Sequence, residues 1–188
     1  MTFDYQAARL TMVESQVRTS DVTDLHVQDA MRIAPRESLC PADKQGLAYA
    51  DAEIEYAPGL FLLRPRAAGK LLQALKPRPG DKALAIAAPY CGLVMRGIGC
   101  LVDEIAAGAT PAKGKYQLIV AEGAVTEVPA AWTAALAEGG RMAVILRPGP
   151  MGKVRIYVRA GGQITSYEAF DAAASFLPGF EPKAQFAF

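Results

Sequence analysis

The sequence predicts a single α/β domain, in which a mostly parallel sheet ends in an antiparallel hairpin and is preceded by helices. Three observations support this fold class. Apolar residues recur at helical spacing up to about residue 78. From Lys82 onward, short apolar runs alternate with turns of small residues, as in buried parallel strands. Only Arg159-Ala160-Gly161-Gly162 joins the last two runs, which is typical of a hairpin. We therefore expect a helical cap over residues 1–78 and a sheet core over residues 79–188.

Four helical segments are expected in the cap. The first runs to about Arg18, and the second starts after a Thr23 cap and ends near Ile33. A third covers residues 42–50, and the fourth starts at Pro65. Spacing by three and four places apolar residues on one face of the first and fourth helices. These residues are Phe3, Ala7, Leu10, Val13 and Val17 in the first helix, and Ala68, Leu71, Leu72 and Leu75 in the fourth.

Six apolar runs in the second part of the chain predict the strands. A helix is expected among them over residues 129–138, with Pro129 at its start and Gly139-Gly140 where a left-handed cap would lie. Residues 185–188 are expected to add an edge strand. The six runs cover residues 83–87, 100–102, 116–121, 142–146, 154–158 and 163–167.

The composition excludes several classes of protein. The chain has 20 Lys and Arg residues against 19 Asp and Glu residues, so a nucleic-acid binder held by a general positive field is not expected. The three cysteines, Cys40, Cys91 and Cys100, and the single His26 lack the spacing of metal ligands, so we expect no metal and free thiols in the cytoplasm. No secretory signal is expected, and the longest uncharged stretch, residues 83–95, is too short to span a bilayer.

Several short motifs follow one another in a familiar order. They are Met12-Val13-Glu14-Ser15-Gln16-Val17-Arg18, Val22-Thr23-Asp24, Pro35-Arg36-Glu37, Ala48-Tyr49-Ala50-Asp51, and Tyr116-Gln117-Leu118-Ile119-Val120-Ala121-Glu122-Gly123-Ala124-Val125 with Val128-Pro129. From about residue 5 to the C-terminus, the chain resembles the protein-L-isoaspartate O-methyltransferase family. The resemblance implies a Rossmann-like methyltransferase sheet, a helical N-terminal subdomain and S-adenosylmethionine as methyl donor. It also implies methylation of isoaspartyl carboxylates in damaged proteins.

The resemblance implies a cofactor turn at the end of the first core strand, where family members look like V-L-D/E-I-G-x-G-x-G-Y. The corresponding run here is Ala83-Leu84-Ala85-Ile86-Ala87-Ala88-Pro89-Tyr90. Ala85 stands in place of the acid, Ala87 stands in place of the first glycine, and the turn before Tyr90 is shorter. Pro89 also removes a hydrogen-bonding amide. We therefore expect that the chain does not bind S-adenosylmethionine.

The family also has an acid at the end of its second strand, where it hydrogen-bonds the ribose hydroxyls. Asp103 or Glu104 stands where that acid would lie, although a solvated charge at a strand end is the simpler interpretation. Only residues 105–115 separate this position from the strand that starts at Tyr116. The family places a helix, another strand and a loop in this interval, and a parallel crossover usually needs a dozen or more residues. We therefore expect that one helix-strand unit is deleted.

The substrate side has changed as well. A G-x-T-x-S type segment holds the substrate carboxylate in the family, whereas residues 59–65 carry no hydroxyl. Arg64 and Arg66 would attract a carboxylate, or they are simply cations at the start of a helix. His26 has no nucleophile near it in the sequence, and Gly97-Ile98-Gly99 precedes a strand instead of following one. We therefore assign no catalytic residue.

These losses favour a pseudoenzyme that keeps the family's sheet but has lost S-adenosylmethionine binding and methyl transfer. No cofactor is predicted, and the vestigial cofactor positions are Ala85, Ala87, Tyr90 and Glu104. A deleted helix-strand unit would expose apolar surface or an unpaired strand edge. We therefore expect a protein-binding or structural module, with a homodimer or a partner protein covering the region from Ile98 to Lys115.

Two other functions remain open. One is an active S-adenosylmethionine-dependent methyltransferase, either on isoaspartyl carboxylates or on a changed substrate, which would use Glu104 and a remodelled turn around Tyr90 and Cys91. The other is a sensor that holds a small ligand in the vestigial cleft.

Overall fold

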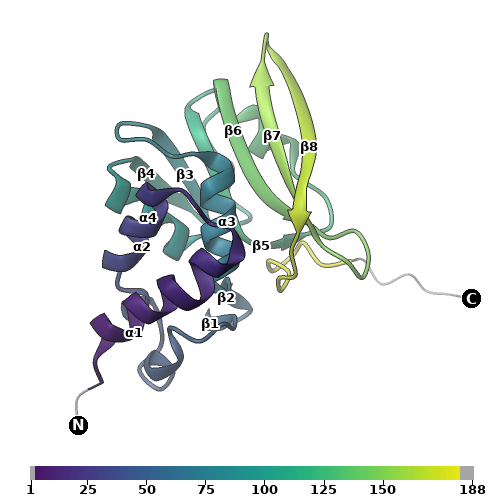
Figure 1. Cartoon of the computed structure of the whole chain (residues 1–188). Coiled ribbons are helices and arrows are strands. Elements are labelled where there is room, and N and C mark those ends of the chain that lie inside the picture. Colours follow the sequence, from purple (N-terminus) through teal and green to yellow (C-terminus); the bar gives the residue numbers. More distant parts are fainter. Residues whose placement is uncertain (1–2, 183–188) are drawn as a thin grey trace, which may run out of the picture.

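The computed structural model of the protein describes residues 3–182 (Figure 1). Its strands are β1 (Ile54–Ala57), β2 (Leu60–Leu62), β3 (Lys82–Ile86), β4 (Leu101–Ile105), β5 (Tyr116–Val125), β6 (Leu136–Leu146), β7 (Lys153–Ala160) and β8 (Gln163–Asp171). Strands β3 to β8 form one sheet in the order β4-β3-β5-β6-β7-β8. The first four of these strands are parallel, and β7 and β8 are antiparallel additions. The predicted fold class, including the C-terminal hairpin, is confirmed.

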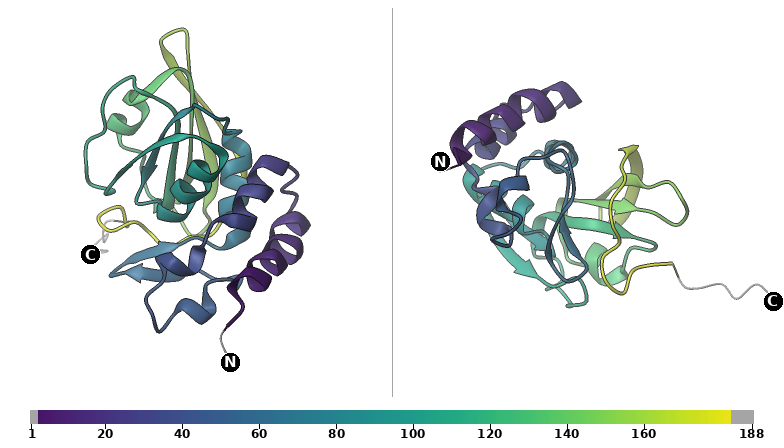
Figure 2. Two further views of the ribbon diagram at one scale, coloured as in Figure 1. Left: turned by 90° about the vertical axis from the view of Figure 1, so that its left-hand side faces the viewer. Right: turned by 90° about the horizontal axis from the view of Figure 1, so that it is seen from below.

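The four longer α-helices pack on one face of the sheet, and the shortest lies on the other face (Figure 2). The α-helices are α1 (Tyr5–Met12), α2 (Leu25–Ile33), α3 (Pro65–Leu75), α4 (Pro89–Ile98) and α5 (Ala130–Ala134). Shorter helical turns are η1 (Val13–Val17), η2 (Arg18–Ser20), η3 (Arg36–Leu39) and η4 (Gln45–Leu47). No helix within residues 3–182 is both long enough and apolar enough to cross a membrane.

The first, second and fourth predicted helices are present. Helix α1 continues through η1 and η2 to Ser20, and the predicted apolar face of α3 is fully buried. The cap of α2 is Asp24 instead of the predicted Thr23, because the Asp24 carboxylate accepts the His26 amide at 2.9 Å. The Thr23 amide instead donates to the side chain of Gln73 at 2.6 Å, which ties the start of α2 to α3.

The expected helix over residues 42–50 is wrong. This segment consists of turns with only the short 3-10 turn η4. The Arg36 guanidinium donates a hydrogen bond to the Ala48 carbonyl at 2.7 Å, so tertiary contacts hold this backbone in a non-helical conformation. Strands β1 and β2 follow it as a small separate hairpin that the sequence patterns did not predict.

Helix α4 was also not predicted. Its ten residues include a proline and two glycines, Gly92 and Gly97, which are poor helix formers. Pro89 occupies the first turn, where a proline is tolerated because that amide has no partner within the helix. Gly92 allows α4 to pack closely on β3, since a methyl group there would lie 3.2 Å from the Ala85 Cβ. Close contact between α4 and β3 therefore outweighs the low helix propensity.

The helix expected over residues 129–138 is too long. Helix α5 ends at Ala134, and β6 begins at Leu136, which pairs with Tyr116 of β5. The side chains of Trp132, Ala135 and Leu136 are buried as expected. Pairing with β5 therefore overrides the local helical pattern.

Alternation along the strands divides the core between the two faces of the sheet. Ala83 and Ala85 belong to the larger cluster with the N-terminal helices, whereas Leu84 and Ile86 face Trp132 on the other side. Residues beyond β8 cross the end of β5, where Phe176 pairs with Ala124. The edge strand expected over residues 185–188 lies outside the described residues. Residues 106–115 connect β4 to β5 without a helix or strand.

Candidate functional site

A cleft lies at the carboxyl ends of β3 and β4, the edge of a parallel sheet at which α/β proteins usually bind ligands. Its volume is about 380 Å³. Three of the four vestigial cofactor positions, Ala85, Ala87 and Glu104, line it, whereas Tyr90 does not. The full lining is Tyr56, Leu60, Ala85, Ala87, Ala88, Pro89, Glu104, Ile105, Ala106 and Ala107. The cleft is therefore largely apolar, with one carboxylate.

The wall of this cleft at β3 has no polar group where the family has an acid. Ala85 is fully buried, and α4 packs closely against it at Gly92. A methyl group at Gly92 would also lie 3.1 Å from Glu104 Oε1, so this part of the wall has little free space. A longer side chain at residue 85 would press on α4.

The turn between β3 and α4 directs its backbone amides into the protein. Ala87 has φ of +44°, a left-handed conformation that favours glycine, and its amide donates to the Ile105 carbonyl at 2.8 Å. Pro89 has no amide hydrogen. The Tyr90 amide donates to Glu122 Oε2 at 3.0 Å. The helix N-terminus, which holds anionic ligand groups in many nucleotide sites, is therefore capped by a side chain of the same molecule.

Glu122 belongs to the motif of residues 116–125, but no role is predicted for it from the sequence. It is 1% exposed in the middle of β5, and its Oε1 accepts a hydrogen bond from the Cys91 thiol at 3.4 Å. Burial raises the pKa of the Glu122 carboxyl to about 7, although the Arg36 charge and the hydrogen bonds from Tyr90 and Cys91 of α4 oppose the rise. The sequence feature that could have identified Glu122 is a single acidic residue within an apolar strand, because a buried charge needs a specific partner.

Arg36 lies on the other side of Tyr90 and completes a buried polar cluster. The guanidinium carbon lies 4.6 Å from the centre of the Tyr90 ring, and Nη2 donates to the Leu63 carbonyl at 2.6 Å. Burial raises the pKa of the Tyr90 phenol and the pKa of the Cys91 thiol well above their ordinary values. We call Arg36, Tyr90, Cys91 and Glu122 the Arg36–Glu122 cluster. It belongs to the core, so Tyr90 is placed behind the cleft and not in it.

The two acids at the end of β4 have different surroundings, because successive strand residues face opposite sides. Glu104 Oε1 pairs with Arg96 Nη1 at 2.5 Å, and both side chains are 45% exposed. Asp103 accepts hydrogen bonds from Lys115 Nζ at 2.6 Å and from Tyr116 Oη at 2.9 Å. These bonds, the one from Lys115 above all, lower the pKa of the Asp103 carboxyl. Only Glu104 reaches the cleft.

The other candidate residues lie away from the cleft. His26 is exposed on α2. Arg64 and Arg66 are exposed at the start of α3, where Arg66 Nε lies 3.4 Å from Asp51 Oδ2, and they line a second cavity. Leu63, which precedes them, is fully buried. Within residues 3–182, no three His, Cys, Asp or Glu side chains form a group suited to a metal ion.

Comparison with known proteins gives a consistent result. No protein-family model matches the chain. The protein-L-isoaspartate O-methyltransferase of Methylorubrum extorquens is 28% identical over 205 residues, which cover 93% of this chain and 89% of that protein. The enzyme of the same name from Methylorubrum populi is 26% identical over 92% and 94% of the two chains. A third, from Aeropyrum pernix, is 38% identical over 84 residues, 45% of this chain and 32% of its own length.

Solved structures share the fold. A Plasmodium falciparum protein-L-isoaspartate O-methyltransferase in complex with S-adenosyl-L-homocysteine superposes with a TM-score of 0.74 at 14% identity, over 90% of this chain and 97% of that one. A second protein-L-isoaspartate O-methyltransferase superposes with a TM-score of 0.73 at 15% identity, over 94% and 67% of the two chains. The motifs and the alignments agree, so this chain is similar over nearly its whole length to protein-L-isoaspartate O-methyltransferases, and it shares their fold.

Proposed function

We propose that this protein has lost S-adenosylmethionine binding and methyl transfer, uses no cofactor and works as a protein-binding or structural module. The observation that carries the proposal is the turn between β3 and α4. Its amides are bonded to Ile105 and Glu122, its first glycine position is Ala87, and its proline has no amide hydrogen. A cofactor would therefore meet methyl groups where close backbone approach and hydrogen-bond donors are needed.

The structure also supports a binding surface on β4. This strand pairs with β3 alone, so its outer edge has no neighbouring strand among the described residues. Leu101 on β4 is 62% exposed. The alignment with the Methylorubrum extorquens relative runs over 205 positions, more than the 188 residues of this chain, so that relative carries residues with no counterpart here. We propose that a second copy of the chain, or a partner protein, covers the region from Ile98 to Lys115, since exposed strand edges and apolar residues favour association.

The net charge and the cysteines bear on the class of partner and on the compartment in which the protein works. The net charge of +1 supports a protein partner over a nucleic acid. Cys40, Cys91 and Cys100 are buried free thiols, which supports a reducing compartment such as the cytoplasm.

Isothermal titration calorimetry with S-adenosyl-L-homocysteine tests the loss of cofactor binding. We expect no saturable heat up to millimolar ligand, while the Methylorubrum extorquens relative serves as the positive control. Saturable binding at micromolar concentration would overturn the proposal. Circular dichroism on the same sample verifies that the protein is folded.

Light scattering after size exclusion tests the binding surface. The proposal expects a mass above 20.0 kDa, or a copurifying partner. Leu101→Lys should abolish the association, because a charge in the centre of an apolar contact is costly to bury. Leu47→Lys is the matched control, since Leu47 is 58% exposed and lies on η4 instead of β4. A wild-type monomer without a partner, or equal effects of both variants, would count against this surface.

A second function is favoured by the cleft itself. Its volume of about 380 Å³ lies within the range of small-ligand sites, and Glu104 stands at the strand end where the family binds ribose. The chain would then be an active S-adenosylmethionine-dependent methyltransferase, on isoaspartyl or changed carboxylates. The same calorimetry separates the two proposals, since this one requires binding by the wild type and weaker binding by Glu104→Gln.

A further inference from the structure

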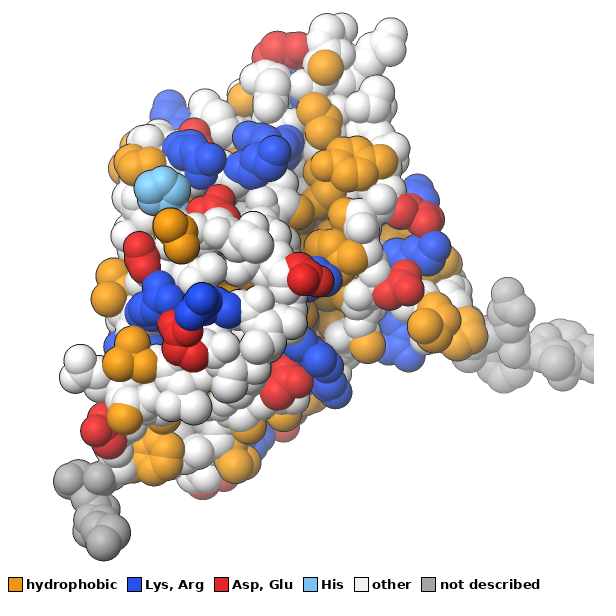
Figure 3. Space-filling model, in the orientation of Figure 1, with side chains coloured by type: hydrophobic (Ala, Val, Ile, Leu, Met, Phe, Trp, Pro, Cys, Tyr) orange, Lys and Arg blue, Asp and Glu red, His pale blue; other side chains and the backbone are white. Residues whose placement is uncertain are grey.

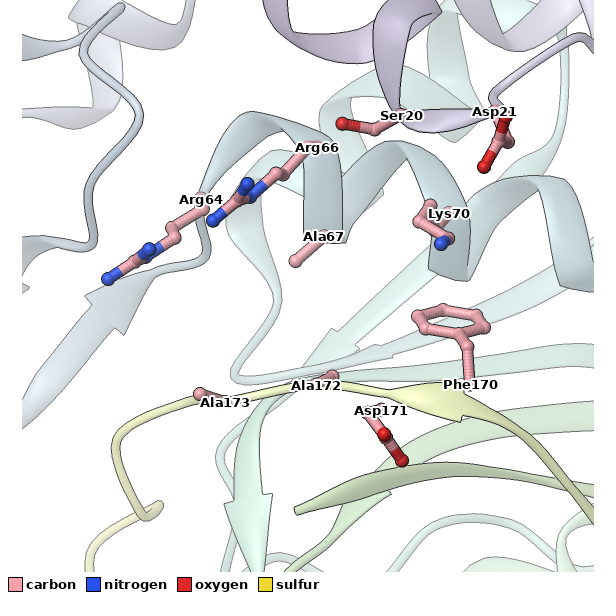
Figure 4. A pocket seen from close by; sticks show the side chains of 10 residues that line it. All are labelled: Ser20, Asp21, Arg64, Arg66, Ala67, Lys70, Phe170, Asp171, Ala172 and Ala173. Carbon is pink, nitrogen blue, oxygen red and sulfur yellow. The ribbon is translucent and has the colours of Figure 1, made fainter. Parts of the chain in front are cut away.

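A second cavity, separate from the cleft at β3, lies between α3 and the end of β8 (Figure 4). Its volume is about 310 Å³. Arg64 and Arg66 flank it at the start of α3, whereas Lys70 and Phe170 are at its other end. It is lined by Ser20, Asp21, Arg64, Arg66, Ala67, Lys70, Phe170, Asp171, Ala172 and Ala173. Hydrophobic side chains gather where the helices meet β7 and β8 (Figure 3).

The cations around this cavity are arranged unfavourably for the protein itself. Arg66 and Lys70 are four residues apart on α3, where like charges repel each other. Arg64 is the N-cap residue of the same helix, and no acidic residue lies in its first turn. The three positive charges beside this cavity therefore do not stabilise the helix, although the exposed side chains of Arg64 and Arg66 are hydrated. Local rules are broken in this way mostly at functional sites.

The charges of these cations are balanced unequally. Arg66 has Asp51 at 3.4 Å. The Lys70 ammonium lies 4.7 Å from the centre of the Phe170 ring, and Asp21 is on the same side of the cavity (Figure 4). Arg64 has no carboxylate within 4.0 Å in the part of the chain that the structure describes. The same holds for Lys70, so within residues 3–182 the cavity has a cation without a carboxylate partner at each end, and Arg64 is the guanidinium of the two.

We propose that this cavity binds a small organic carboxylate with an apolar body. The carboxylate pairs with the planar guanidinium of Arg64, whose paired N–H groups match two carboxylate oxygens. The apolar body lies between Ala67 and Ala172 and extends toward Phe170. A volume of about 310 Å³ lies within the range of small-ligand sites, so the cavity is large enough for a short fatty acid or a compound of similar size.

A single negative charge suits the site better than a doubly charged anion. Asp21 and Asp171 also line the cavity, although Asp171 points away from α3 (Figure 4). These carboxylates reduce the positive field and would repel a second negative charge. Inorganic phosphate, which is largely a dianion above pH 7, is therefore expected to bind more weakly than a monocarboxylate of similar size.

Titration with hexanoate, followed by amide NMR shifts, tests the proposal at low salt. We expect saturable shifts confined to the residues of the cavity, with weaker effects of phosphate and of hexylamine. Arg64→Gln should weaken hexanoate binding about tenfold, since it removes a charge-assisted pair. Lys76→Gln is the matched control, because it removes the same charge from the exposed opposite end of α3 and should leave the affinity within about twofold of wild type.

A second variant separates loss of the site from loss of the fold. Ala67→Leu fills the cavity and leaves all its charges in place, so it should abolish the hexanoate shifts while the rest of the spectrum is unchanged. The proposal is overturned if hexanoate does not saturate, if phosphate binds as tightly, or if Arg64→Gln binds like wild type. The cofactor cleft has no part in this experiment, so its outcome is independent of the function proposed above.

Discussion

Two cavities of this protein, the cleft at β3 and the cavity at α3, lie close to the same end of the sheet, yet their polar groups have different partners. Around the cleft at β3, the Ala87 amide donates to the Ile105 carbonyl and the Tyr90 amide donates to the Glu122 carboxyl group. Glu104 is paired with Arg96. Around the cavity at α3, the Arg64 guanidinium has no carboxylate within 4.0 Å among the described residues. The first arrangement stabilises the fold, whereas the second is suited to a ligand.

This difference indicates how a cleft can persist as a shape while the polar groups around it bond to other parts of the protein. The cleft remains because it lies outside the carboxyl ends of β3 and β4, a position that follows from the fold. The fold does not determine the direction of the hydrogen-bond donors. They depend on the sequence of one turn, and here Ala87, Pro89 and Glu122 direct them inward. Free polar groups are therefore better evidence for a ligand than the size of a cavity.

Removal of Arg36 is expected to have the largest effect. Its guanidinium is fully buried, donates to two carbonyls and lies over Tyr90. Arg36→Ala should lower the free energy of unfolding by about 4 kcal/mol, because it leaves buried acceptors unpaired and Glu122 uncompensated. Urea denaturation measures the change. Arg18→Ala, at an exposed ion pair, is the control and should cost less than about 1 kcal/mol. A loss below about 1 kcal/mol for Arg36→Ala would show that the Arg36–Glu122 cluster is not structural.

Glu122 should make the stability depend on pH. Its pKa is raised to about 7 in the folded protein, so the folded state holds a proton that the unfolded state releases above about pH 4.5. The contribution of this group is therefore complete below about pH 4.5 and is lost as the pH rises through 7. Relative to Glu122→Gln, which does not titrate, the wild type should lose on the order of 3 kcal/mol across this range. Equal pH profiles for the two proteins would show that Glu122 is not desolvated.

Sequence reasoning found the sheet and missed the parts that depend on contacts across the chain. Strands β3 and β5 can be recognised in the sequence as apolar runs, because both faces of these strands are buried and their residues are therefore apolar. Helix α4 was missed because its stability comes from Gly92 packing on Ala85. The division at residue 78 stays a prediction. Of the site, the vestigial positions followed from the resemblance, whereas the role of Glu122 depends on a hydrogen bond between residues 32 positions apart.

The turn itself offers a smaller test. Ala87 is left-handed at φ of +44°, so Ala87→Gly removes a steric cost of about 1–2 kcal/mol and adds an entropic cost of about 0.5–1 kcal/mol. We expect a net gain of about 0.5 kcal/mol in the free energy of unfolding, without any binding of S-adenosyl-L-homocysteine. Ala88→Gly is the matched control, since its φ of −127° is allowed to any residue, and it should destabilise the protein. Recovery of binding by Ala87→Gly alone would show that one methyl group, and not the inward direction of the amides, closes the cleft to the cofactor.

The smallest effect is expected at the mouth of the cleft. Glu104 and Arg96 form an ion pair at 2.5 Å, but both side chains are 45% exposed, so water screens the attraction. Glu104→Gln should therefore change the free energy of unfolding by at most about 0.5 kcal/mol, and 0.5 M salt should reduce even that difference. Thermal and urea denaturation of the two proteins measure it. A loss above about 1 kcal/mol would place Glu104 with the Arg36–Glu122 cluster as part of the structure. If the effect is as small as expected, any change in ligand binding by Glu104→Gln reports on the ligand alone, which makes this carboxylate the cleanest probe of whether the cleft still has a use.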